Sequence, residues 1–207
     1  MVNIPNRIAF IHLSGLIVSS LMLSGPAISQ ELAPMEEREY QIGDTWVNEK
    51  RDGSEISSEL TSISGDDFTF MDDDGCSYVL GRDFRPSASW KDCGGSSGKQ
   101  TVTSASGSIW PLQVGKSITF DYEESSGSRK WSNSSRKCKV TGTEMVTVPA
   151  GTFDTFVDVC TNGGNRSWQR TRWLSPELGI QVQYKRYHMG QNNISTFLKL
   201  KRFEPGN

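Results

Sequence analysis

The stretch CKVTGTEMVTVPAGTFDTFVDVC, residues 138–160, contains two β-prone runs separated by a Pro-Ala-Gly sequence at 149–151. Proline and glycine this close together are typical of a turn. Residues directly opposite each other in an antiparallel hairpin have a constant index sum, and Cys138 and Cys160 have their midpoint at Pro149. The stretch therefore predicts a hairpin whose two strands are joined by a disulfide between Cys138 and Cys160.

The two remaining cysteines fit the same hairpin geometry. Cys76 and Cys93 have their midpoint between positions 84 and 85, beside Pro86. We therefore predict a second cross-strand disulfide, Cys76–Cys93, although four cysteines allow three pairings in principle. Each disulfide would close a loop of roughly 18 to 23 residues and stabilise the fold by about 3 kcal/mol. Paired cysteines are typical of exported proteins.

The rest of the chain repeats this succession of β-prone runs and turns. Glycine accounts for 20 of the 207 residues, and turn signals such as Asp52-Gly53 separate short runs rich in Val, Ile and aromatic residues. We therefore expect an all-β fold, a curved antiparallel sheet of meandering hairpins that forms a half-barrel or an open barrel. Segments 41–109 and 110–207 share the same order of features, which fits either an internal duplication or the self-similarity of any hairpin meander.

The N-terminal region has the features of a secretory signal peptide. Arg7 precedes an apolar run from Ile8 to Leu23, and the small residues Ala27 and Ser29 follow it. We predict cleavage after Ser29, with an uncleaved membrane anchor as the alternative. Because no cysteine lies near this site, a lipid anchor is not expected.

Three parts of the chain follow from this cleavage. They are a signal peptide at 1–29, a flexible lead at 30–40 and a single all-β domain at 41–207. No run after the signal peptide is apolar for long enough to cross a membrane. We therefore expect the chain in the periplasm or secreted.

Charge is divided unequally along the predicted mature chain. Residues 30–109 contain 7 Lys and Arg against 16 Asp and Glu, whereas residues 110–207 contain 14 against 8. An export signal and an acidic mature chain argue against nucleic-acid binding. The opposite charges fit attraction between the halves or to a neighbouring molecule, and a basic face for anionic envelope material is the alternative.

Three motifs resemble a signature of uncharacterised bacterial exported proteins. They are VPAGTFDT at 148–155, W-x-SPELG at 173–179 and WPL-x-VGK at 110–116. The resemblance covers residues 110–200 well and the first half of the chain poorly. It implies a curved antiparallel sheet similar to the half-barrels of envelope lipoprotein carriers, and it transfers no catalytic residue.

One run in the second half alternates aromatic and basic residues. Trp168, Arg170 and Arg172 share one face of the strand expected at 166–174, and Trp173 lies on its other face. These four residues are the candidate ligand-binding residues, although most Trp residues of a β protein pack in the core or across strands. An aromatic and basic lining would suit a lipid or glycan ligand.

The sequence offers little for catalysis or metal binding. His188 is the only histidine of the predicted mature chain, and no nucleophile motif accompanies it. The acidic run Asp72-Asp73-Asp74 lacks the spacing of a calcium loop, and paired cysteines would leave too few zinc ligands. We therefore predict no catalytic residue, no metal and no cofactor.

The predicted function is a non-enzymatic envelope binding or interaction module. Such a module would hold an apolar or anionic ligand on the concave face of its sheet, or bind another envelope protein. A structural envelope protein whose interior is filled by its own side chains is the first alternative. A hydrolase centred on His188 is the second and weaker one.

Overall fold

The computed structural model describes residues 32–163 and 168–206, so the predicted signal peptide at 1–29 lies outside the described residues. The described chain contains twelve strands and one short 3-10 turn, η1 (Arg82–Phe84), between β4 and β5. The strands are β1 (Thr45–Lys50), β2 (Glu55–Ser64), β3 (Asp67–Asp72), β4 (Ser77–Gly81), β5 (Ser89–Cys93), β6 (Ser96–Ser108), β7 (Ser117–Ser126), β8 (Arg129–Val148), β9 (Gly151–Gly163), β10 (Trp168–Ser175), β11 (Ile180–His188) and β12 (Asn193–Glu204).

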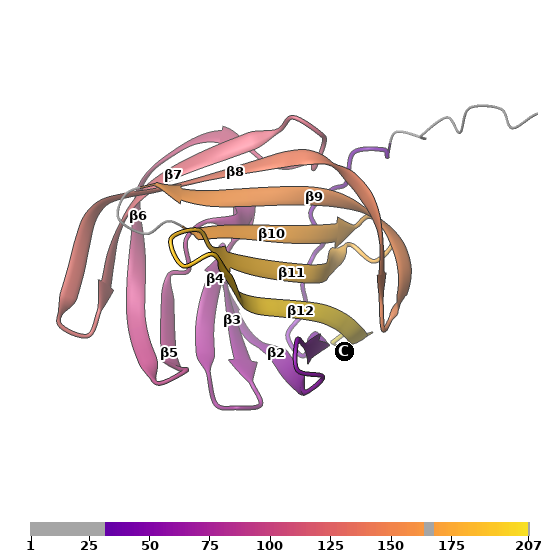
Figure 1. Cartoon of the computed structure of the whole chain (residues 1–207), viewed down its shortest axis with the longest axis horizontal. Coiled ribbons are helices and arrows are strands. Elements are labelled where there is room, and N and C mark those ends of the chain that lie inside the picture. Colours follow the sequence, from indigo (N-terminus) through magenta and orange to yellow (C-terminus); the bar gives the residue numbers. More distant parts are fainter. Residues whose placement is uncertain (1–31, 164–167, 207) are drawn as a thin grey trace, which may run out of the picture. The chain divides into compact units, whose positions relative to one another are not determined.

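The strands form a closed antiparallel barrel, which confirms the all-β prediction and corrects the half-barrel or open barrel. Each strand pairs with the next along the chain, and β1 also pairs with β12, for example Trp46 with Phe203. Figure 1 shows β9–β12 running crosswise to β3–β6. Closure removes the two free sheet edges that an open barrel would expose. The sequence could not reveal it, because the closing pair joins segments about 150 residues apart and no turn connects them.

The hairpin predicted at 138–160 is present, and so are both disulfides. Cys138 lies directly opposite Cys160 in the β8–β9 ladder, with Cα atoms 3.9 Å apart. Cys76 and Cys93 flank the β4–β5 hairpin, with Cα atoms 4.5 Å apart. Both predicted pairings are therefore confirmed, but only Cys138 and Cys160 lie directly opposite each other, because the β4–β5 register, with Ser77 opposite Lys91, is one residue off the predicted one. The suggested duplication stays a prediction, although the proposed boundary falls between β6 and β7, the middle of the strand order.

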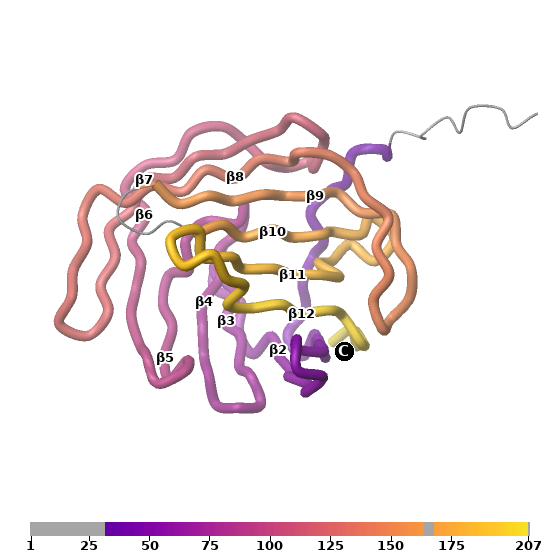
Figure 2. Tube along the Cα trace, viewed as in Figure 1, coloured from indigo at the N-terminus to yellow at the C-terminus, as the bar shows by residue number. Residues whose placement is uncertain are grey.

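The long β8–β9 hairpin bends over the outside of the barrel. A register shift between Val140 and Gly142 marks the irregular point of this ladder, and bulges of this kind bend and twist strands. Beyond it, the backbone N–H of Ala150 donates to the carbonyl of Leu200 on β12 at 3.0 Å. The tube in Figure 2 follows this hairpin to its tip near the C-terminal end of β12.

Three clusters of buried apolar residues result from this arrangement. Two are built inside the barrel: one around Phe120, the Cys138–Cys160 disulfide and Phe156, and a smaller one around Leu60 and Phe70. The third joins the bent hairpin to β10–β12. Its members are Val146, Val148, Phe153, Trp173, Ile180, Val182 and Leu200. The interior of the barrel, hereafter the lumen, is thus only partly filled by these clusters.

The segment before β1 packs against one end of the barrel. Met35 is 4% exposed and forms a two-way backbone bridge with Leu112, at 3.0 and 2.8 Å. Asp44 is fully buried, and its carboxylate accepts a hydrogen bond from the backbone N–H of Gly206 at 2.8 Å. Residues 32–40, predicted as part of a flexible lead, therefore supply a buried side chain and help to position this end.

Candidate functional site

Three of the four predicted ligand-binding residues face the lumen together. Trp168, Arg170 and Arg172 alternate along β10 and point to the same side as Asp158 and Cys160 of β9. Trp168 is 2% exposed, whereas Arg170 and Arg172 are partly exposed. The alternation on β10 was therefore correctly read as one face of a strand.

Trp173, the fourth predicted residue, lies on the outer side of the barrel. Its indole N–H donates to a carboxylate oxygen of Glu144 on the bent hairpin at 2.8 Å. A shallow groove of about 450 Å³ runs beside it and is bordered by Lys185 and Lys199. The structure thus separates Trp173 from Trp168 and the two arginines, because adjacent residues of a strand point to opposite faces.

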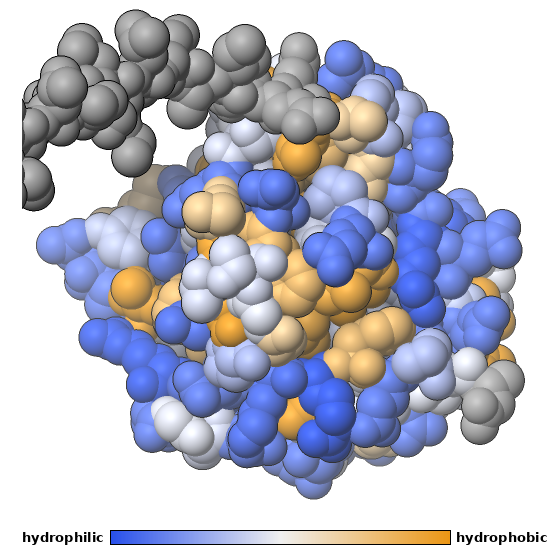
Figure 3. Space-filling view, turned by 90° about the vertical axis from the view of Figure 1, so that its right-hand side faces the viewer, coloured by the Kyte–Doolittle hydropathy of each residue, from blue (hydrophilic) through white to orange (hydrophobic). Residues whose placement is uncertain are grey.

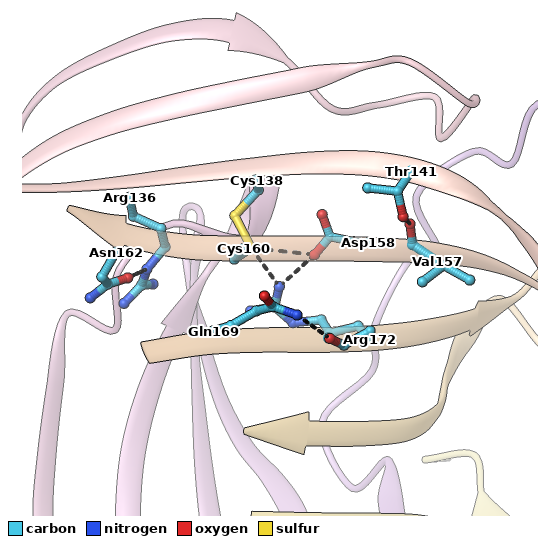
Figure 4. Close-up of polar contacts among 10 residues, drawn as sticks. Arg136, Cys138, Thr141, Val157, Asp158, Cys160, Asn162, Gln169 and Arg172 are labelled. Atoms are coloured by element: carbon cyan, nitrogen blue, oxygen red, sulfur yellow. Dashed lines mark hydrogen bonds and ion pairs between the residues drawn. A yellow bond between two sulfur atoms is a disulfide. The ribbon is translucent and has the colours of Figure 1, made fainter. Parts of the chain in front are cut away.

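Asp158 is a fully buried acid of the lumen, and it forms an ion pair with Arg172. The distance from Arg172 Nη1 to Asp158 Oδ2 is 2.7 Å, and the same nitrogen lies 3.0 Å from Cys160 Sγ. Figure 4 shows these groups converging beside the disulfide. Burial raises the pKa of Asp158 above its usual value, and the charge of Arg172 only partly offsets this.

Two further arginines, which the sequence analysis did not select, complete a luminal arginine cluster around Trp168. The Cζ atoms of Arg170, Arg186 and Arg136 lie 3.7, 4.9 and 5.3 Å from the centroid of the Trp168 ring. Arg136 is only 1% exposed, and its Nε donates to Asn162 Oδ1 at 3.3 Å. Stacking of guanidinium groups on an indole ring is attractive, but it does not neutralise their charges.

Next to this cluster, the lumen contains a cavity of about 200 Å³ between β1–β4 with η1 and β10–β12. Its aromatic lining comes from seven side chains, Tyr40, Trp46, Phe68, Phe70, Tyr78, Phe84 and Trp110. Arg172 belongs to both features, since it lines the cavity and its Cζ lies 4.6 Å from the centroid of the Phe84 ring. We call this space the aromatic cavity.

An ion pair between the segment before β1 and η1 borders the aromatic cavity. Arg82 Nη1 lies 2.7 Å from Glu37 Oε2, and the guanidinium stacks 5.0 Å from the centroid of Phe68. Burial raises the pKa of the neighbouring Tyr40 to about 12, so its hydroxyl stays protonated.

Figure 3 looks onto the side of the molecule where β10 and β12 end and shows hydrophobic residues at its centre within a hydrophilic rim.

The other predicted sites have simple positions. His188 ends β11, opposite Trp168 in the ladder. In the described ranges 32–163 and 168–206, two groups of Cys and Asp come close enough to hold a metal ion, around Cys160 and around Cys76, but their cysteines are disulfide-bonded and supply no thiolate. Among the described residues, no helix is long and apolar enough to cross a membrane.

The sequence contained only weak signals for the residues that it failed to identify. Arg136 stands in a polar run, SNSSRKCK, which gives no sign that this arginine points inward. Its position two residues before Cys138 is the usable signal, because residues two apart share a face and the disulfide is buried. The aromatic cavity depends on strands from both ends of the chain, so no local pattern could have predicted it.

Comparison with known proteins supports the fold alone. No protein-family model matches the chain, and no curated protein matches its sequence. The solved structure of the hypothetical lipoprotein YmcC from Escherichia coli is similar, with a TM-score of 0.52 and 16% identity over 83% of this chain and 92% of that chain. A protein with a YmcC-like fold from Bacteroides fragilis covers 84% of this chain and all of its own, at 11% identity and a TM-score of 0.39. The likeness to the Escherichia coli protein indicates a shared fold.

Proposed function

We propose that this chain is a non-enzymatic envelope protein that holds a small, largely apolar ligand in the aromatic cavity. The observation that carries the proposal is a luminal space of about 200 Å³ whose lining includes seven aromatic side chains. An apolar cavity of about 150 Å³ is large enough to hold benzene, so this one suits a molecule with a single ring or a short acyl chain. Small-molecule sites are typically concave, with apolar walls and polar groups that orient the ligand. The polar part of this lining consists of Glu37, Asn48, Ser58, Arg82, Asp83, Arg85, Arg172 and Gln181.

An exported location belongs to the same proposal. Two disulfides are typical of oxidising compartments. The region from Arg7 to Ser29 has the pattern of a signal peptide. The structurally similar Escherichia coli protein is described as a hypothetical lipoprotein. These three observations favour the periplasm or the outside of the cell.

The test is binding of 4-fluorotoluene, a small neutral aromatic probe, followed by 19F NMR on the purified, disulfide-bonded chain. We expect saturable binding that is lost in Leu198→Trp, because Leu198 lines the cavity and the larger ring would occupy it. Met145→Trp is the control, since Met145 is 71% exposed on the bent hairpin. Thermal unfolding of both variants checks that each is folded.

Two results would refute the proposal. One is the absence of saturable binding to the unaltered chain. The other is equal binding to Leu198→Trp and Met145→Trp when both are folded. Mass spectrometry of an organic extract of the exported protein identifies the natural ligand, and a structural protein with a filled interior would release none.

A further inference from the structure

The luminal arginine cluster carries more positive charge than the described residues neutralise. Arg136, Arg170 and Arg186 all lie within 5.3 Å of the Trp168 ring centroid, measured from Cζ. Their side chains come from β8, β10 and β11, three strands of the second half of the chain. No ion pair joins any of the three to an acid in the described part of the chain.

The arrangement of these arginines is unfavourable by itself. Arg170 lies directly opposite Arg186 in the β10–β11 ladder, and like charges at directly opposite positions destabilise a sheet. Burial lowers the pKa of Arg136 well below its usual value, and the charge of Arg170 lowers it further. Because a guanidinium group does not lose its proton in proteins, the fold must carry this repulsion unless an anion offsets it.

The cluster also contains hydrogen-bond donors without acceptors. Arg136 Nη2 and Arg186 Nε are buried and have no hydrogen-bond partner among the described residues. Unsatisfied buried donors cost free energy, so each such group needs an explanation. Arg170 and Arg186 are only partly buried, so part of each side chain stays accessible to solvent and to solutes.

The nearby acids already have other partners. Asp158 pairs with Arg172, and Glu124 accepts a hydrogen bond from Gln100 Nε2 at 2.8 Å. Tyr122, a further polar neighbour, stays neutral, because burial raises the pKa of its hydroxyl. The described lumen therefore supplies positive charge and free donors but little negative charge to meet them.

We infer that Arg136, Arg170 and Arg186 bind an oxyanion, a carboxylate or a phosphate group, inside the barrel. The planar fork of a guanidinium group donates two hydrogen bonds to two oxygens of a carboxylate or a phosphate. Arg172 connects this position to the aromatic cavity, because its guanidinium stacks on Phe84. The inference rests on the proposed function. It narrows the ligand to a small acid whose apolar part occupies the aromatic cavity and whose oxyanion contacts the arginines. A free oxyanion, bound without an apolar part, is the alternative.

The experiment compares three probes by 19F NMR or calorimetry at constant ionic strength set with sodium chloride. They are 4-fluorobenzoate, inorganic phosphate and the neutral 4-fluorotoluene. Arg186→Met and Arg136→Met remove luminal charge, whereas Lys185→Met removes the same charge from the adjacent, outward-facing position of β11. We expect anion binding that is at least tenfold weaker in the two arginine variants and unchanged in Lys185→Met.

The outcomes separate the two proposals. Binding of 4-fluorobenzoate without phosphate assigns the oxyanion to the cavity ligand, and binding of phosphate alone indicates a free anion; both support the site. Binding of 4-fluorotoluene with neither anion overturns this inference and leaves the proposed function standing. Binding of no probe overturns both. Equal losses in Lys185→Met and Arg186→Met also overturn the inference, because they would indicate nonspecific attraction.

The arginine variants have a second readout that guards against misfolding. If the cluster serves an anion, removing one of its charges should leave the chain at least as stable in anion-poor buffer, since a repulsive group has gone. Phosphate or 4-fluorobenzoate should then raise the unfolding temperature of the unaltered chain more than that of the variants. A large loss of stability in both arginine variants, with or without anions, would assign these arginines a structural role and overturn the inference.

Discussion

Removal of the luminal disulfide should cost more than removal of the other disulfide, although their loops are similar. The Cys138–Cys160 bond spans a sequence separation of 22, and the Cys76–Cys93 bond spans 17. Loop-closure entropy gives about 3.4 kcal/mol for the first and about 3.1 kcal/mol for the second, so entropy alone hardly separates them.

Burial makes the difference. Cys138 and Cys160 are both fully buried in the larger luminal cluster, whereas Cys76 is 8% exposed and Cys93 is more exposed still. Replacing two buried sulfur atoms by hydrogen in a packed interior adds a cavity cost of about 1–2 kcal/mol. We therefore expect a loss of about 4.5–5.5 kcal/mol for Cys138→Ala with Cys160→Ala, against about 3 kcal/mol for Cys76→Ala with Cys93→Ala.

Equilibrium unfolding in urea, monitored by tryptophan fluorescence, measures both losses. The free energies extrapolated to water are compared instead of the midpoints, because a chain without a cross-link exposes more surface and has a steeper denaturant dependence. A luminal variant that loses no more than the other one would refute the reasoning. It would mean that the lumen relaxes around the missing sulfur atoms or that this hairpin is loosely packed.

Three further predictions follow from single residues. Phe156 is a core residue that is 1% exposed, so Phe156→Ala should lower the free energy of unfolding by about 3–5 kcal/mol. Met145 is exposed on the hairpin, so Met145→Ala should lower the free energy of unfolding by less than about 0.5 kcal/mol. Both values are measured by unfolding in urea. Arg82→Gln removes two partly exposed ion pairs, to Glu37 and to Asp66, so it should lower the free energy of unfolding by no more than about 1–2 kcal/mol. The same substitution should speed the entry of 4-fluorotoluene into the cavity, measured by 19F line shape. Burial raises the pKa of Asp72. The contribution of this carboxyl to stability is therefore fully present below the unfolded-state pKa and is lost as pH rises through the folded-state pKa. Asp72→Asn should flatten this part of the stability–pH curve, and an unchanged curve would contradict the assignment of the pH dependence to Asp72.

The strands and disulfides could be predicted because their determinants are local. Turn residues such as Pro149 and Gly53 mark the hairpins, and the index sum of Cys138 and Cys160 depends only on the chain between them. Each covers at most a few tens of residues, so a single sequence contains the needed information. The family motifs at 148–155 and 173–179 fall on the β8–β9 and β10–β11 hairpins, which agrees with the turns expected there.

Closure and the aromatic cavity escaped prediction because their determinants are not local. Trp46 meets Phe203 across the closing pair, and Phe84 faces Arg172 from a different part of the chain. Alternation could show that Arg170 shares a face with Trp168, but it could not show whether that face was the inside of a closed barrel. The same limit applies to Trp173, whose burial depends on a hairpin that bends back over it.

Folding into a barrel places part of the excess positive charge of the second half of the chain inside the molecule. Residues 110–207 have 14 Lys and Arg against 8 Asp and Glu, and the sequence analysis related this excess to attraction between the halves or to a neighbouring molecule, with a basic face as the alternative. In the folded chain, four of these cations point into the lumen: Arg136, Arg170, Arg172 and Arg186. Among the described residues, Arg172 is the only one of the four in an ion pair, which it forms with Asp158. Charge on a surface is screened by water and salt, whereas charge inside a barrel is screened much less. These four cations should therefore attract an anion more strongly than exposed cations would, and this favours the lumen over the outer groove beside Trp173 as the place to test for the proposed ligand.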